Sequence, residues 1–191
     1  MKYPEIYKFI NALHPLTESD WAAAGEILKE KRMKKDEFFI REGETVDRYA
    51  IITKGVVRLY HQGEDGKQYT KAFRSPLSLV CPYAEALMKI PSQTYVETVT
   101  DAVLYVGKLS DFFGLMEKHT SWNGVGRAVA EKMYVEKAKR EFEFLKLSAT
   151  ERYRAFVKES PEVVDLVPQY QIASYLGITP VALSRLRGRK K

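Results

Sequence analysis

The stretch IASYLGITPVALSRLR, residues 172–187, decides how the C-terminal part of this 191-residue chain folds. Ile172 and Leu176 share one face of a short helix, and Gly177 can adopt the left-handed conformation that ends it. Thr179 then fits the N-cap of a second helix. The stretch therefore predicts two short helices joined by a sharp turn.

The second helix is predicted to begin at Pro180, with Ile178 and Leu183 in the two positions of a hydrophobic staple. A rotation of 100° per residue then places a different set on the outer face: Val181, Ser184 and Arg185, with Arg187 on the flank. Two short helices around a glycine turn, the second displaying arginine, are typical of a helix-turn-helix that sets a recognition helix into the major groove. A helical hairpin with a solvated basic end is the alternative.

The predicted DNA-binding residues are those that could reach base edges or phosphates. Arg185 can bond bidentately to guanine, Ser184 can bond base edges or phosphate, and Val181 can contact a thymine methyl group. Arg189, Lys190 and Lys191 are expected to add phosphate contacts. The full predicted set is Thr179, Val181, Ser184, Arg185, Arg187, Arg189, Lys190 and Lys191.

The net charge of +6 is confined to one end of the chain. Residues 1–126 carry 17 Lys and Arg against 17 Asp and Glu, whereas residues 127–191 carry 14 against 8. A basic surplus in one segment is the electrostatic pattern expected of a nucleic-acid-binding module.

The region between residues 36 and 109 has the composition of a small all-β unit. Its β-rich runs are separated by turn signals: EFFI, YAIITKGVVRLY, QYTKAF, LSLV and TYVETVTDAVLYVG. Before it, residues 14–35 are predicted to be helical, with Thr17 as the N-cap and Asp20 three residues on.

After it, residues 111–147 are predicted to form one long amphipathic helix. Five apolar residues recur along it at steps of seven, three, four and three: Ala128, Val135, Ala138, Phe142 and Leu145. This stripe either packs on the chain's own β unit or forms a dimer seam. Ser148 and Glu151 are predicted to open the next helix with a capping box.

Taken together, these elements closely resemble the Crp/Fnr family of bacterial transcription regulators. The matching features are Gly43 and Gly55 at turns of the β unit, EDGK at residues 64–67, and the C-terminal helix pair. The resemblance implies an α+β fold with an N-terminal double-stranded, jelly-roll-like β-roll as sensor, a long dimerisation helix and a C-terminal helix-turn-helix domain with a reduced wing. The corresponding boundaries are 1–110, 111–147 and 148–191. It also implies a cytoplasmic homodimer on a two-fold symmetric operator.

The sequence departs from the family where cyclic nucleotides bind. Members that bind them use a Gly-Glu pair before a short helix and an Arg-Ser pair after it, but here the stretch reads LVCPYAEALMKIPSQTYVE. Without the arginine, a buried phosphate loses a charge-assisted bidentate partner. Cyclic AMP is therefore not the expected ligand. Another effector could still meet a pocket lined by Tyr83, Glu85, Ser92, Gln93 and Thr94.

The sequence contains no nucleophile with a neighbouring base, no metal-ligand spacing and no phosphate-binding glycine loop, so we expect neither an enzyme nor a metal or cofactor site. No apolar run is long enough for a membrane helix. The expected partners are double-stranded DNA and a second copy of the chain, with RNA polymerase and a small-molecule effector left open. The competing function is a cyclic-nucleotide-type sensor or scaffold that acts through protein contacts without binding DNA.

Overall fold

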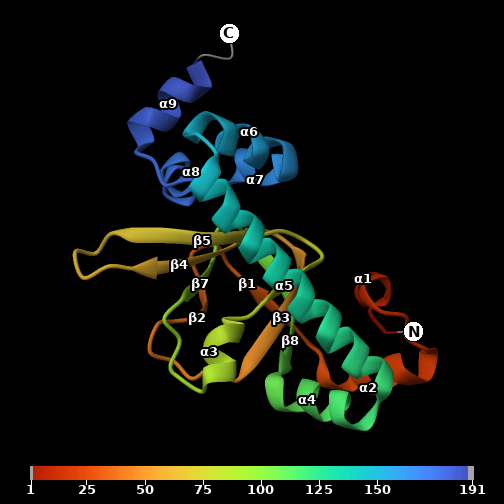
Figure 1. The fold of residues 1–191 in the computed structure, drawn as a ribbon. Coiled ribbons are helices and arrows are strands. Elements are labelled where there is room, and N and C mark those ends of the chain that lie inside the picture. The colour runs from red at the N-terminus through yellow and green to blue at the C-terminus, as the bar shows by residue number, and fades with distance from the viewer. Residues whose placement is uncertain (1, 189–191) are drawn as a thin grey trace.

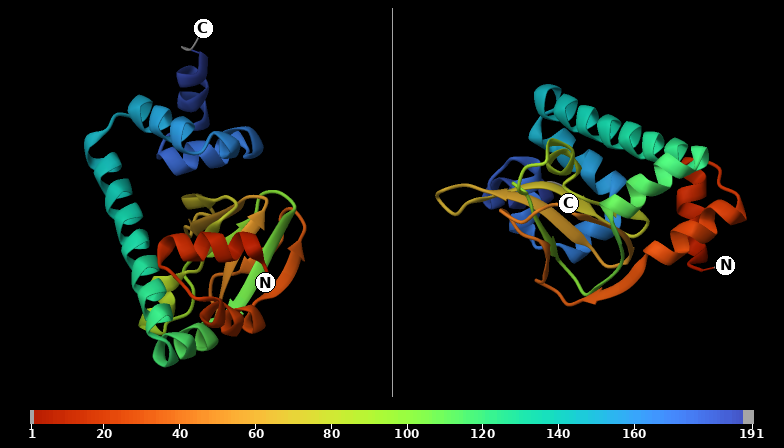
Figure 2. Two further views of the ribbon diagram at one scale, coloured as in Figure 1. Left: turned by 90° about the vertical axis from the view of Figure 1, so that its right-hand side faces the viewer. Right: turned by 90° about the horizontal axis from the view of Figure 1, so that it is seen from below.

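The structure, a computed structural model, describes residues 2–188. A β-roll forms the body, a long helix runs along one side of it, and a group of short helices lies at one end (Figures 1 and 2). No helix within the described residues has both the length and the apolar character that crossing a bilayer requires.

Two helices precede the roll, α1 (Pro4–Leu13) and α2 (Glu18–Ile27). Thr17 and Asp20 form the predicted capping box at the start of α2. The predicted helix over residues 14–35 was too long, because α2 ends at Ile27 and the next residues form strand β1 (Lys29–Met33). This strand is mostly exposed and charged, and it is held in place by antiparallel pairing with β8.

The roll contains two four-stranded antiparallel sheets, with strand orders β1-β8-β3-β6 and β2-β7-β4-β5. The predicted β-rich runs all appear as strands of these sheets: β2 (Phe38–Ile40), β3 (Arg48–Lys54), β4 (Val57–Gln62), β5 (Gln68–Arg74), β6 (Ser78–Val80), β7 (Tyr95–Thr98) and β8 (Ala102–Lys108). A short helix, α3 (Tyr83–Met88), joins β6 to β7. The two predicted turn glycines, Gly43 and Gly55, both have positive φ angles, of 84° and 88°.

The roll passes into two helices, α4 (Leu109–Lys118) and α5 (Thr120–Lys146). The predicted long helix over residues 111–147 therefore begins at Thr120, since His119 has an extended backbone that separates it from α4. Trp122, Val125 and Gly126 near the start of α5 are buried. The main core joins the interior of the roll to α1, α2, α4 and this first part of α5.

Up to residue 188, the last described one, the chain continues in four short helices: α6 (Ala149–Glu159), α7 (Pro161–Leu166), α8 (Gln169–Leu176) and α9 (Pro180–Gly188). The predicted capping box between Ser148 and Glu151 is present. These helices share a second core that also includes Val56 and Val99 of the roll, and Phe73 of the roll packs against it. The C-terminal helices are therefore packed directly on the roll.

Candidate nucleic-acid interface and ligand region

The turn between α8 and α9 has the backbone geometry that the sequence predicts. Gly177 has φ 68° and ψ 32°, in the left-handed region. The amide of Ile178 donates to the carbonyl of Ala173 at 3.0 Å, and the amide of Gly177 donates to that of Ser174 at 3.2 Å. These two bonds form a Schellman motif. A Cβ at residue 177 would also lie 2.8 Å from the ring of Phe144, so a larger residue would have to displace that ring as well as adopt a positive φ.

The start of α9 is fixed by its cap and by its buried face. The hydroxyl of Thr179 accepts a 3.2 Å hydrogen bond from the amide of Ala182, as an N-cap does. Leu183 is only 1% exposed and belongs to the second core together with Ile172, and Ile178 packs against the same core. The inward face of α9 is thus anchored to α8.

The outward face of α9 is free. Val181 is 61% exposed, and Ser184, Arg185 and Arg187 are also exposed. Neither Arg185 nor Arg187 forms an ion pair with any acidic residue between 2 and 188. The four side chains predicted to face a partner are therefore exposed together. Arg189, Lys190 and Lys191 lie outside the described residues.

The predicted stripe of α5 points away from the roll over most of its length. Val135, Phe142 and Leu145 are 62%, 56% and 77% exposed, Ala138 is exposed, and Ala128 is half-buried. Tyr134, which the periodicity did not pick out, is 73% exposed beside them. The alternative that this stripe packs on the chain's own β unit is therefore wrong for the second half of the helix. An apolar face that a monomer leaves in water is typical of an interaction surface.

The five predicted pocket residues do not line one pocket. Glu85, Ser92 and Thr94 form a buried cluster, whereas the side chain of Gln93 is exposed. Tyr83 lines a separate apolar cavity. Within the cluster, the hydroxyl of Thr94 donates to Oε1 of Glu85 at 2.7 Å, and the hydroxyl of Ser92 donates to the carbonyl of Thr94 at 2.7 Å.

The carboxyl group of Glu85 remains ionised in this cluster. Burial pushes its pKa upward, but the hydrogen bond from Thr94, a backbone hydrogen bond and the charges of Lys71 and His61 outweigh burial, so the pKa lies below its ordinary value. Its Oε2 atom has no partner among the described residues. The cluster is therefore a buried negative charge, which disfavours an anionic ligand at this position.

A buried arginine, which sequence reasoning missed, lies where the helices meet the roll. Arg58 of β4 is 1% exposed. Its Nε donates to the hydroxyl of Thr70 at 3.0 Å, its Nη1 donates to Oε1 of Gln68 at 2.6 Å, and its guanidinium lies 4.3 Å from the ring centre of Tyr60. Burial lowers the pKa of Arg58, while the nearby charge of Glu97 opposes that effect. The signal for this site was a lone arginine inside the apolar run VVRLY.

The same strand residues hold α8 in place. The hydroxyl of Ser174 accepts from the amide of Thr70 at 2.9 Å and donates to the carbonyl of Gln68 at 2.7 Å. Arg140 of α5 donates to the carbonyls of Thr70 and Tyr175 at 3.2 and 2.9 Å. The position of the helix pair is thus set by hydrogen bonds from both β5 and α5.

Residues 30–119 match the sequence profile of the cyclic nucleotide-binding domain. The matched residues run from β1 to the end of α4. No curated protein sequence matches the chain.

Solved structures with the same architecture extend the likeness beyond this domain. FixK2 from Bradyrhizobium japonicum superposes with a TM-score of 0.74 at 20% identity, covering 85% of this chain and 84% of that one. A putative Crp/Fnr-family regulator from Eubacterium rectale superposes with a TM-score of 0.72 at 14% identity, covering 95% of this chain and 85% of that one. A putative cAMP-binding regulatory protein from Silicibacter pomeroyi superposes with a TM-score of 0.66 at 18% identity, covering 97% of this chain and 87% of that one. The resemblance to Crp/Fnr regulators and the α+β fold it implies are confirmed.

Proposed function

We propose that this chain is a dimeric transcription regulator of the Crp/Fnr type that binds double-stranded DNA in a sequence-specific manner. The observation that carries the proposal is the exposed face of α9, where Val181, Ser184, Arg185 and Arg187 are accessible on a helix whose other face is buried. Arginine, serine and a small apolar side chain are groups that read base edges in the major groove.

Within this proposal, the residues of α9 have separate roles. Arg185 specifies a guanine through a bidentate contact, and Val181 meets a thymine methyl group. Ser184 bonds to a base edge or to phosphate, as do Thr179 and Arg187 at the ends of the contact surface. Arg189, Lys190 and Lys191 supply attraction to phosphates that does not depend on sequence.

Dimerisation is proposed through the exposed stripe of α5, namely Ala128, Val135, Ala138, Phe142 and Leu145, extended by Tyr134. A two-fold dimer would present two copies of α9 to two half-sites, which helix-turn-helix dimers read about one helical turn apart. The apolar exposure of Val135, Phe142 and Leu145 supports this assignment, because burying such side chains against a second copy removes them from water.

The proposed division of labour follows the chain: a sensor unit over residues 1–110, a connecting and dimerising segment over 111–147, and a DNA-reading unit over 148–191. The sensor is not proposed to bind cyclic AMP, because the ionised Glu85 lies in the buried cluster with Thr94 and Ser92. Arg74 of β5 is already paired with Glu136 at 2.8 Å, which leaves its guanidinium less available to a phosphate.

The experiment that tests DNA binding needs no knowledge of the operator. Labelled random duplex is titrated with the protein at several salt concentrations. The proposal predicts that the logarithm of the association constant falls linearly with the logarithm of the salt concentration. The slope should be about −0.9 for each phosphate contact. Absence of binding at low salt would favour the scaffold function instead.

A further inference from the structure

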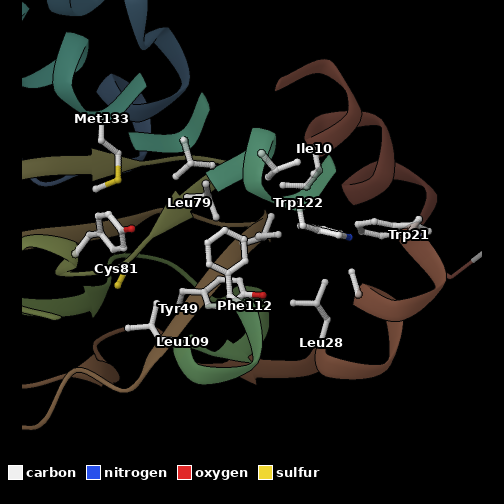
Figure 3. Close-up of a pocket in the computed structure, with 15 residues that line it drawn as sticks. Ile10, Trp21, Leu28, Tyr49, Leu79, Cys81, Leu109, Phe112, Trp122 and Met133 are labelled. Carbon is white, nitrogen blue, oxygen red and sulfur yellow. The ribbon is translucent and has the colours of Figure 1, made fainter. Parts of the chain in front are cut away.

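An apolar cavity of about 50 Å³ lies outside the roll, between the sheet containing β3 and β6 and the helices α1, α2, α4 and α5 (Figure 3). Tyr49 and Ile51 of β3 line it, and they alternate with Ala50 and Ile52, which lie on the opposite face of that strand. The cavity is thus separate from the space between the two sheets and from the Glu85 cluster.

The cavity has a closed end and a mouth. Trp21, Trp122 and Ala24 form the closed end and are all at least 97% buried. At the other end the lining side chains are only half-buried: Leu79, Cys81, Tyr83, Val129 and Met133. Figure 3 shows Met133 and Cys81 on the side away from the two tryptophans. The mouth therefore lies between α5 and the chain that enters α3.

Among residues 2–188, no charged side chain lines this space. The indole nitrogens are engaged elsewhere, since Trp21 donates to the carbonyl of Lys2 at 2.8 Å and Trp122 donates to that of Asp20 at 2.9 Å. Burial, with a smaller effect from Glu85, raises the pKa of the Cys81 thiol to about 12, so this group is neutral. A charged ligand would lose its hydration here without gaining a partner.

We propose that this cavity binds a slender, uncharged apolar ligand, such as an unbranched alkyl chain, which enters tail first and reaches the two tryptophans. Protein interiors leave few voids larger than a water molecule, so an apolar space of this size beside a mouth is unusual. Its volume is about a third of the roughly 150 Å³ of an engineered apolar cavity that takes up benzene. This smaller volume therefore disfavours a ring such as benzene.

The position of the cavity gives such a ligand a regulatory role, and this role alone rests on the proposed function. Val129 and Met133 line the cavity from one side of α5, while Val135 and Phe142 belong to the proposed dimer seam on another. Tyr83 is the first residue of α3. A ligand in the cavity would thus contact both α5 and α3.

The 191-residue protein is titrated, without DNA, with 1-butanol, 1-pentanol and 1-hexanol and separately with benzene. Tryptophan emission is one readout, because both tryptophans of the chain line the cavity. Methyl NMR of ¹³C-labelled methionine is the other, with Met133 as the reporter and the buried Met33 of the roll core as the reference. We expect saturable changes at Met133 and the tryptophans, with affinity rising about fourfold for each added methylene group. Benzene is expected to bind more weakly than 1-hexanol.

Ala24→Leu is expected to fill the closed end and to weaken 1-hexanol binding at least tenfold, whereas Ala22→Leu, on the exposed side of the same helix, should leave it unchanged. If Ala24→Leu does not fold, Val129→Phe narrows the mouth and should have the same effect. The proposal is overturned by the absence of saturation, by equal changes at Met33 and Met133, or by unchanged binding to the filled variant that folds. Because no DNA is present, these outcomes are independent of whether the protein binds an operator.

Discussion

The hydroxyl of Ser174 on α8 bridges two backbone groups of β5, accepting from the amide of Thr70 and donating to the carbonyl of Gln68. Residues about a hundred positions apart in the sequence are thereby joined at the contact between the roll and the helix pair. Close by, Phe73 of β5 packs against Phe156 and Tyr175, with ring centres 6.1 and 5.5 Å apart. The helix pair is therefore positioned by the roll and not by α5 alone.

Replacing Ser174 by alanine should lower the free energy of unfolding by about 1–3 kcal/mol, because the amide of the buried Thr70 loses its partner. Urea denaturation followed by circular dichroism measures this change. Ser184→Ala, on the exposed face of α9, is the matched control and should leave the unfolding midpoint unchanged. Equal midpoints for Ser174→Ala and the wild type would contradict the role given to this bridge.

Replacing Val135 and Phe142 together by glutamate should convert the protein to a monomer. Both side chains are more than half exposed in the single chain, and burying a charge against a second copy without a partner is costly. Light scattering measures the mass. Leu166→Glu, at an exposed apolar residue on α7, is the control and should remain dimeric. A double variant that keeps the wild-type mass would exclude this seam.

Cyclic AMP should not bind the roll at micromolar concentrations. The ionised Glu85 repels a phosphate, and the Arg74 guanidinium is paired with Glu136. Isothermal calorimetry with the wild-type protein tests this directly. A saturable heat signal with a micromolar or tighter dissociation constant would show that another cation meets the phosphate and that the account of this region is wrong.

The ionised state of Glu85 should also appear in the dependence of stability on pH. Because folding lowers its pKa, the ionised group contributes stability above its ordinary value of about 4.3, and this contribution is lost as the pH falls through the lower folded-state value. The difference in free energy of unfolding between wild type and Glu85→Gln should be constant above about pH 5.5 and shrink below about pH 4.3. A difference that stays constant down to the acid transition would exclude this effect.

The elements that local sequence specifies were predictable. Capping residues such as Thr17 and Ser148 form hydrogen bonds within four residues, and Gly177 ends α8 because of its own backbone freedom. The outer face of α9 follows from helical periodicity alone. These features depend on neighbours in the chain, which the sequence displays.

What escaped prediction depends on distant partners. The charged run at 29–33 becomes a strand only because β8 pairs with it. The buried state of Arg58 depends on Thr70 and Gln68 across the hairpin and on α8 above them. The candidate pocket residues were grouped by closeness in sequence, but α3 directs Tyr83 to the apolar cavity and Glu85 to the buried cluster. Sequence spacing alone does not predict that Tyr83 and Glu85 point to different places, because this depends on how α3 is oriented against the roll.

The central claim is that α9 reads DNA in a two-fold complex, and selection from a random duplex pool followed by affinity measurement tests it most directly. The account predicts enrichment of a two-fold symmetric motif by the wild-type protein. On that motif, Arg185→Ala should cost about 1–3 kcal/mol and relax the preference at one position in each half-site. Arg154→Ala, at an exposed arginine on α6, should leave both the affinity for the motif and the base preference unchanged. Selection that enriches no two-fold motif, together with binding to random duplex that does not fall with salt, would contradict the claim.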